Sequence, residues 1–297
     1  MEGPKMITVG LPAYNEEKSV AKTIASILEQ ISRNDQVLVV DNGSADGTAE
    51  EIKKMQKKDK RVKLLTIKGN NGKCPALNLI IKSAKSDIIV QTDADVVLKQ
   101  GAIKALVEHF NNPKIGGVSG NPMPIIPAKN LFYEWTIMSY KKIHELRMKE
   151  SREGTFWHLS GYLLAFRKKA LKKVPNAKGA VDALMGRIIS RNGYKMVYEP
   201  RAGVLVKCPT TIKDFINQKA RVRAGYYFLS KRAEKAPRAM GGEILFFLAE
   251  LMKIPLTRWH KFLFSAAVYA YAWVKGYYLA KTNKPLQQIW KVPYSTK

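Results

Sequence analysis

The chain is poor in residues that form covalent cross-links or bind transition metals. Its 297 residues include two cysteines, Cys74 and Cys208, and four histidines, without the spacing of a zinc site. This cysteine usage indicates a reducing compartment and no disulfide framework, although a single bridge stays open. The first residues lack the apolar stretch of a secretory signal. The sequence therefore predicts neither a disulfide-rich secreted domain nor a zinc protein.

Acidic residues are also scarce. The chain has 51 Lys and Arg against 24 Asp and Glu, a formal net charge of +27. Such an excess attracts polyanions, namely nucleic acid, an anionic membrane face or phosphorylated substrates. From Arg201 onward there are 18 basic and 4 acidic residues among many aromatic and aliphatic ones, which favours a membrane surface over nucleic acid. A heat-adapted protein with a Lys-rich surface is an alternative explanation for the positive charge. Such a surface usually carries Glu in proportion, and this chain does not.

The hydrophobic pattern alternates between the period of a strand and the period of a helix. This order predicts an α/β fold with a mostly parallel sheet and helices on both faces. The hydrophobic fraction of 46% is enough for a sizeable core. We expect strands at 6–11, 36–40, 61–67, 88–90 and 115–119, and helices at 19–31, 48–58, 75–85, 101–110 and 129–149.

Two standard nucleotide-binding motifs are missing. No G-x-G-x-x-G follows the first strand, which argues against a dehydrogenase-like dinucleotide fold, and no G-x-x-x-x-G-K-[ST] occurs, so the chain is not a P-loop NTPase. Instead, the apolar run at Ile88 ends on Asp93 and Asp95. Ligands bind past the carboxyl ends of strands in such sheets, and paired carboxylates suit Mg²⁺ or Mn²⁺ together with substrate phosphates. Alone, the two acids would equally fit a polar strand end.

Four motifs stand in order at the predicted strand ends. They are Pro12-Ala-Tyr-Asn-Glu16, Val40-Asp-Asn-Gly-Ser-Ala-Asp-Gly-Thr48, Asn71-Gly-Lys-Cys-Pro-Ala-Leu-Asn78 and Thr92-Asp-Ala-Asp95. Together they resemble the family 2 inverting glycosyltransferases with the GT-A fold, the nucleotide-diphospho-sugar transferase fold. The resemblance covers roughly residues 6–230.

The resemblance implies a nucleotide-sugar site at the first four strand ends. Asp95 would ligate the metal on the diphosphate, and Asp93 would face the ribose or the metal. Asn42 stands where many members have a second Asp, which leaves the base specificity open because an amide both donates and accepts. The residues implied in nucleotide-sugar binding are Pro12, Tyr14, Glu16, Asp41, Asn42, Lys73 and Asp93.

The resemblance also implies a catalytic base and an acceptor side. Asp182, at the start of a predicted helix, matches the base that takes the acceptor proton. Ser160 and Gly161 match a small-residue turn beside the donor sugar and acceptor. Gln218 and Arg221 match the Q-x-x-R part of the synthase signature Q-x-x-R-W, beside the acceptor or the diphosphate. Val222 replaces the Trp, which favours transfer of a single sugar over chain elongation.

The C-terminal part is basic and apolar. Residues 241–254 form an amphipathic pattern, and residues 262–280 carry one charge, Lys275. The second stretch is marginal for spanning a bilayer of roughly 30 Å, so an interfacial helix, a membrane span and a packing helix all stay open. We expect a catalytic domain at 1–235 and membrane-associating helices at 236–297. The basic residues favour association with the cytoplasmic face of a membrane.

We therefore expect a metal-dependent glycosyltransferase that moves a sugar from a UDP- or GDP-sugar to a hydroxyl of a glycan or lipid-linked acceptor. A polyprenyl-phosphate acceptor is the alternative, since an ionised phosphate needs no base. A nucleic-acid-binding protein is a distant alternative, because the predicted acidic cleft would repel phosphate without a metal. A nucleotidyltransferase would need a Gly- and Lys/Arg-rich loop after the first strand, which Pro12-Ala-Tyr-Asn-Glu16 is not.

Overall fold

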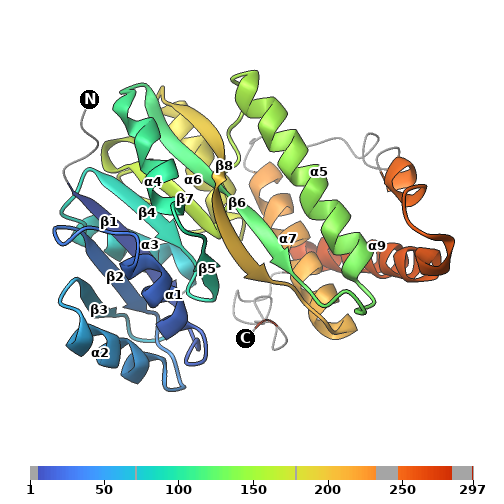
Figure 1. Ribbon diagram of the computed structural model, residues 1–297, viewed down its shortest axis with the longest axis horizontal. Helices are drawn as coiled ribbons and strands as arrows, with labels where there is room; N and C mark the ends of the chain where they lie inside the picture. Colours follow the sequence, from blue (N-terminus) through green and yellow to red (C-terminus); the bar gives the residue numbers. More distant parts are fainter. Residues whose placement is uncertain (1–5, 71, 178, 232–246, 283–295, 297) are drawn as a thin grey trace.

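The computed structural model describes residues 6–70, 72–177, 179–231, 247–282 and 296. An eight-stranded sheet runs through it in the order β3-β2-β1-β4-β7-β6-β8-β5 (Figure 1). The strands are β1 Ile7–Ala13, β2 Gln36–Asp41, β3 Val62–Thr66, β4 Ile88–Thr92, β5 Val96–Leu98, β6 Ile115–Ile125, β7 Leu163–Arg167 and β8 Lys195–Lys207. The long helices are α1 Val20–Leu28, α2 Thr48–Lys58, α3 Lys73–Ser83, α4 Ala102–Glu108, α5 Tyr133–Arg152, α6 Val181–Arg191, α7 Ile212–Lys231 and α9 Trp259–Lys281.

The sheet is mainly parallel, as the sequence pattern predicts. Strands β3, β2, β1 and β4 pair in parallel, as do β6 and β8. Strand β7 enters between β4 and β6 in the opposite direction, and β5 pairs antiparallel with β8. Because β7 runs backwards, its first residue, Leu163, pairs with Thr92 at the end of β4. The turn before β7 therefore lies at the carboxyl edge of the parallel strands.

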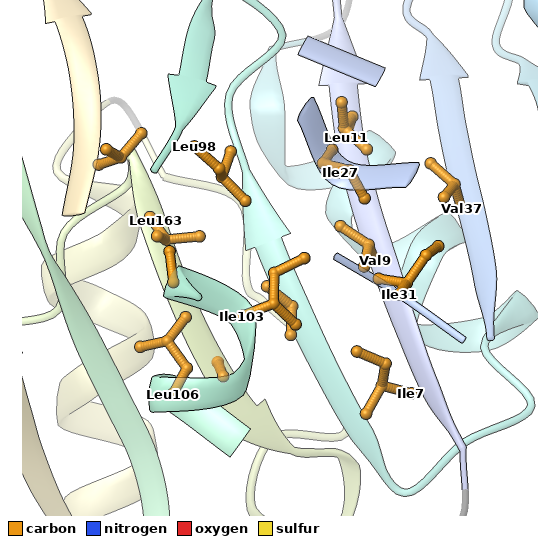
Figure 2. Close-up of a cluster of buried hydrophobic side chains, with 14 of the residues drawn as sticks. Ile7, Val9, Leu11, Ile27, Ile31, Val37, Leu98, Ile103, Leu106 and Leu163 are labelled. Carbon is orange, nitrogen blue, oxygen red and sulfur yellow. The ribbon is translucent and has the colours of Figure 1, made fainter. Parts of the chain in front are cut away.

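Two hydrophobic cores cover the two faces of the sheet. Neighbouring residues of β4 point to opposite faces, so Ile88 and Val90 join one core while Ile89 joins the other. The first core packs α1 and α4 on the sheet through side chains such as Ile27 and Leu106 (Figure 2). The second core packs α3 and α6 on the opposite face. Full burial on both faces accounts for the nearly continuous apolar runs in the central strands.

The strand expected at 115–119 is longer in the structure. Strand β6 continues through a Pro-rich stretch to Ile125 and pairs Pro122 with Val204 and Pro124 with Val206. Strand β7 pairs with β6 only as far as Ser119, so among the described strands β6 pairs with β8 alone beyond that residue. Proline is tolerated there because its missing N–H faces the free side of the strand.

A third cluster attaches the C-terminal helices to the rest of the protein. Phe132 stacks on Phe215 with ring centroids 4.1 Å apart, and Trp135 stacks on Phe247 at 4.5 Å. Helix α9 covers the predicted hydrophobic stretch at 262–280, and residues 247–251 are helical. Among the described residues, no helix has both the length and the apolar character to cross a membrane. The predicted domain boundary near 235 and residues 241–246 lie outside the described residues.

Candidate active site

The loops after β1 and β2 are fastened to each other by side chain to backbone hydrogen bonds. Asn15, whose φ of 53° is left-handed, receives a bond at its side-chain oxygen from the Ala45 N–H at 2.8 Å. The Asn15 N–H donates to Ser44 Oγ at 2.9 Å, and the Glu16 N–H donates to Thr48 Oγ at 2.7 Å. These bonds fix the loop that carries the predicted nucleotide-binding residues of the first motif.

The loop after β2 is tied to the turn before α3. Asp41 ends β2 and accepts a hydrogen bond from the Ser44 N–H at 3.1 Å. The buried Asn42 donates its side-chain amide to Gly72 O at 2.9 Å and to Asn70 Oδ1 at 3.4 Å. Both partners of that NH₂ group are acceptors, so a carboxylate in this place would be repelled. This explains why the chain reads Asp41-Asn42 and not Asp-Asp.

The two aspartates of the fourth motif lie where β4 ends. Asp93 forms an ion pair with Lys73, the first residue of α3. Burial raises the pKa of Asp95 to about 7, and repulsion from Asp93 and Glu16 adds to this rise. Burial lowers the pKa of Lys73, but the nearby carboxylates, Asp93 foremost, outweigh it and the pKa is raised. The site is therefore an acidic cluster with too little positive charge to balance it.

The backbone between these aspartates is held by α1. Thr23 Oγ donates toward Ala94 O at 2.9 Å and Val96 O at 2.7 Å. Thr23 is buried within the helix that packs on the first core. The position of the Asp93–Asp95 segment therefore depends on the core packing of α1 as well as on the sheet.

The donor set fits a hard divalent cation only in part. Carboxylate oxygens are the ligands that Mg²⁺ and Mn²⁺ prefer, and the pKa of Asp95 is raised by its burial first and by the neighbouring Asp93 and Glu16 second. Over the ranges that the structure describes, no group of three or more His, Cys, Asp and Glu side chains is arranged to hold a metal ion. An ion at Asp93 and Asp95 would thus need substrate phosphates as further ligands, which is how Mg²⁺ is commonly held.

Asp182 faces the same cluster from the opposite side. It is the second residue of α6, and its Oδ2 accepts a hydrogen bond from the Gly161 N–H at 2.9 Å. A Cβ built on Gly161 would lie 3.4 Å from both Asp182 Oδ2 and Lys73 Nζ. The glycine therefore leaves open the space between the amine and the carboxylate. The side chains of Gln91 and Thr92, at the end of β4, hold the turn before β7 by donating to Gly161 O at 3.0 Å and Tyr162 O at 2.7 Å.

Helix α7 brings an arginine to the acidic cluster. Burial lowers the pKa of Arg221, while Tyr162, Asp93 and Asp95 act in the opposite direction. Gln218 lies one helical turn earlier and is half-buried. The predicted Q-x-x-R pair is thus on one helix, with its arginine close to the aspartates. Val222, which replaces the Trp of the signature, is 48% exposed.

Helix α7 is pinned to the loop before β7 and to the start of α6. Tyr226 OH and His158 Nε2 are 2.5 Å apart, and the His158 ring stacks on Trp157 with centroids 5.3 Å apart. Gly225 packs so closely that an added Cβ would lie 2.8 Å from Ala180 N. These contacts set the distance between the arginine-bearing helix and the helix that carries the candidate base.

The structure thus gathers most of the predicted site residues around one edge of the sheet. Electrostatic contacts and hydrogen bonds join Glu16, Lys73, Asp93, Asp95, Gly161, Asp182 and Arg221, while Pro12, Tyr14, Asp41, Asn42, Ser160 and Gln218 lie on the adjoining strand ends, turns and helix. Sequence reasoning missed Gln91 and Thr92, whose side chains bond to the backbone of the Gly161 turn, and Tyr162, which interacts electrostatically with Asp95, Asp93 and Arg221. The sequence signal that could have indicated them is the pair of polar residues, Gln91 and Thr92, at the end of an otherwise apolar strand.

An acid-lined edge of this kind, on this mainly parallel sheet, is the framework of GT-A glycosyltransferases. Residues 8–175 match the family described as Glycosyl transferase family 2, so the chain belongs to that family and is a glycosyltransferase. It is 32% identical over 219 residues to a poly-beta-1,6-N-acetyl-D-glucosamine synthase from Staphylococcus epidermidis, covering 72% of this chain and 53% of that protein. A synthase of the same name from Staphylococcus aureus is 28% identical over 223 residues, 74% of this chain and 54% of that one. The chain spans about half the length of these curated relatives.

Solved structures confirm the fold. The mannosyltransferase PcManGT from Pyrobaculum calidifontis, in complex with GDP-Man and Mn²⁺, aligns with a TM-score of 0.65 at 22% identity, covering 97% of this chain and 79% of that chain. S. aureus TarS 1–349 in complex with UDP-GlcNAc aligns with a TM-score of 0.53 at 15% identity, covering 94% and 93%. At these identities the likeness establishes the GT-A architecture.

Proposed function

We propose that the chain is a metal-dependent, inverting glycosyltransferase that moves a sugar from a UDP- or GDP-sugar to a hydroxyl group of a glycan or a lipid-linked acceptor. The observation that carries the proposal is the position of Asp182, whose carboxylate bonds to the Gly161 N–H beside the Lys73–Asp93 pair. An inverting transfer needs a base on the side of the sugar opposite the leaving diphosphate. The arrangement supports Asp182 in that role.

The donor would lie along the ends of β1, β2 and β4. The loops that meet there are held by Asn15 and Asn42, so the nucleotide would enter a preformed surface. Lys73 would contribute positive charge near the phosphates. The proposed nucleotide-sugar contacts are Pro12, Tyr14, Glu16, Asp41, Asn42, Lys73 and Asp93.

The diphosphate end would combine a cation with an arginine. Asp95 and Asp93 would hold Mg²⁺ or Mn²⁺, which when bound supplies positive charge to the leaving nucleoside diphosphate. The solved complex of the similar PcManGT contains Mn²⁺, which supports the choice of ion. Arg221, with Gln218 beside it, would stabilise the negative charge that develops on the leaving group.

The transfer itself is a single displacement at the anomeric carbon. The acceptor oxygen forms its bond to that carbon as the bond to the diphosphate oxygen breaks, and Asp182 takes the acceptor's hydroxyl proton. The anomeric configuration is inverted, and a nucleoside diphosphate leaves with the bonding electron pair. Ser160 and Gly161 would line the space for the donor sugar and the acceptor, because the glycine leaves room there.

Two features narrow the chemical class of the proposed acceptor. A phosphate acceptor is already ionised and would make Asp182 unnecessary, so the base favours a hydroxyl. Val222 offers no aromatic platform for a growing sugar chain, which favours transfer of one sugar per acceptor. We also propose that residues 1–235 form the catalytic domain and that residues 236–297 attach it to the cytoplasmic face of an anionic membrane, where nucleotide sugars are available.

The test is a donor screen that monitors hydrolysis or transfer by mass spectrometry, with UDP- and GDP-sugars, membrane lipid extract as acceptor, and Mn²⁺ or EDTA. The expected result is turnover of one donor class that EDTA abolishes and added Mn²⁺ restores. Equal turnover with and without EDTA would refute the proposed dependence on a metal ion. Absence of binding and turnover for every donor would refute the proposed function.

A further inference from the structure

One face of α9 is apolar and exposed. The helix runs from Trp259 to Lys281 and packs one side against α7 and the third hydrophobic cluster. Its other side carries large side chains that meet solvent, among them Leu263 at 54%, Tyr271 at 59%, Val274 at 55% and Tyr278 at 64% exposure. Their spacing of three, four and eight residues puts them on one stripe. Soluble proteins leave such contiguous apolar stripes uncovered mainly where another surface binds.

The charges carried by α9 and by the sequence around it are basic, although Arg258 is ion-paired with Glu134 at 2.9 Å. The sequence contains no Asp or Glu after Glu250, while eight Lys and Arg residues follow it. Arg258 and Lys261 lie at one end of α9 and Lys281 at the other. The stripe itself ends in tyrosines, whose rings suit the boundary between lipid and water. The surface is therefore complementary to an apolar layer beneath an anionic headgroup region.

We propose that the exposed stripe of α9 is a membrane-contact surface on which the helix lies parallel to an anionic bilayer. This inference rests on the membrane association proposed above and names the surface responsible for it. The 23 residues of α9 give a contact about 34 Å long at 1.5 Å per residue. Pairing two copies through this stripe in an antiparallel manner would bring Arg258 and Lys261 against Lys281, and like charges oppose that arrangement.

The packing of α9 links this surface to the acceptor side of the site. Gly276 lies against α7 so closely that an added Cβ would be 2.6 Å from Ala220 O. Arg223 stacks over the Trp273 ring at 3.4 Å, and Lys275 donates to Asn217 Oδ1 at 3.1 Å. In Figure 1, α7 stands between the sheet and α9. Ala220 directly precedes Arg221, so the helix of the proposed membrane surface packs against the part of α7 that carries this arginine.

The experiment is vesicle flotation of the full chain with phosphatidylcholine alone and with added phosphatidylglycerol. The variant Leu263→Glu with Val274→Glu places two carboxylates on the stripe. Its control is Lys57→Glu on α2, an exposed position that changes the net charge by the same two units. We expect the wild type and the control to float with the anionic vesicles, and the double variant to lose binding about tenfold or more.

A second variant, Tyr271→Ser with Tyr278→Ser, leaves the net charge unchanged and should weaken flotation as well. Wild-type flotation by both variants would overturn the proposal, as would equal flotation of the wild type with neutral and anionic vesicles. A wild-type dimer that the glutamates dissociate, without vesicle binding, would assign the stripe to a second copy. Circular dichroism checks the fold, and hydrolysis of soluble UDP- or GDP-sugar tests the proposed reaction separately from membrane binding.

Discussion

The two sides of the candidate site are built by different physical means. On the side of β1, β2 and β4, short loops carry acids and are held by hydrogen bonds such as that between the Ala45 N–H and Asn15. On the side of α6 and α7, positions are set by close helix packing and ring contacts, as at Gly225 and at the His158–Tyr226 pair. The first side is held by hydrogen bonds between its loops. The second depends on how helices dock.

The largest expected effect comes from the residue that joins the two sides. Asp182→Asn keeps the shape and the bond from the Gly161 N–H but removes the capacity to take a proton. We expect kcat for transfer to a hydroxyl acceptor to fall about 10³-fold, with the KM for the donor unchanged. Steady-state kinetics with varied donor measures both. Lost donor binding would mean that Asp182 belongs to the nucleotide side, and unchanged transfer to a polyprenyl phosphate would favour that acceptor.

Substitutions at two arginines of α7 can separate the proposed catalytic role of this helix from its packing against α9. Arg221 faces the acidic cluster and Arg223 stacks on Trp273. We expect Arg221→Ala to lower kcat about 10²-fold with little effect on unfolding, because it removes charge stabilisation of the leaving group. The matched change Arg223→Ala should cost about 1 kcal/mol of stability and leave kcat nearly intact. Kinetics and thermal unfolding of both variants test the distinction, and interchangeable behaviour would contradict it.

The hydrogen-bonded side is tested at Asn42. Asn42→Asp would place a carboxylate against Gly72 O and Asn70 Oδ1 in a buried position. We expect a loss of about 2 kcal/mol in the free energy of unfolding and a weaker donor affinity, because the turn before α3 is released. Asn42→Ala removes the bonds without adding charge and should cost less. Chemical denaturation and donor titration measure the effects, and a stabilised Asp variant would refute this assignment of Asn42.

The smallest effect is expected at Tyr226. Tyr226→Phe retains the ring but removes the hydroxyl that bonds to His158. We expect about 1 kcal/mol less stability and a roughly fivefold lower kcat without a change in the donor KM, because α7 shifts relative to Asp182. The same change at Tyr271, exposed on α9, is the control and should leave both quantities unaltered. A drop in donor affinity alone would contradict a positioning role.

The same contrast explains what the sequence could predict. Acids such as Asp41 and Asp93 end apolar runs, and parallel strands bring their carboxyl ends to one edge, so the acidic cluster follows from the order of elements. The sequence pattern did not predict that β7 runs antiparallel or that β6 continues through Pro122, because strand pairing is set by tertiary structure. The partner of Asn42 is also remote in the chain, 30 residues away at Gly72. Contacts of this kind leave no local periodicity.

Helix docking was the least predictable part. His158 and Tyr226 are 68 residues apart, and nothing in the surrounding pattern pairs them. The helical periodicity around Arg221 indicates a helix but not which face meets the site. For the stretch that forms α9, the sequence left three alternatives open, namely an interfacial helix, a membrane span and a packing helix. A helix that packs on one side and exposes apolar residues on the other has a composition that fits all three.

The bond from Thr23 to the backbone on both sides of Asp95 has a consequence for how such a chain can change. It ties the segment that carries Asp93 and Asp95 to the core, while Tyr14 lies on the loop after β1. Substitutions around Tyr14 can therefore alter the proposed contacts to the nucleotide without moving the segment that carries Asp93 and Asp95. Laboratory selection for a new donor should accumulate its changes in that loop and leave Thr23 untouched.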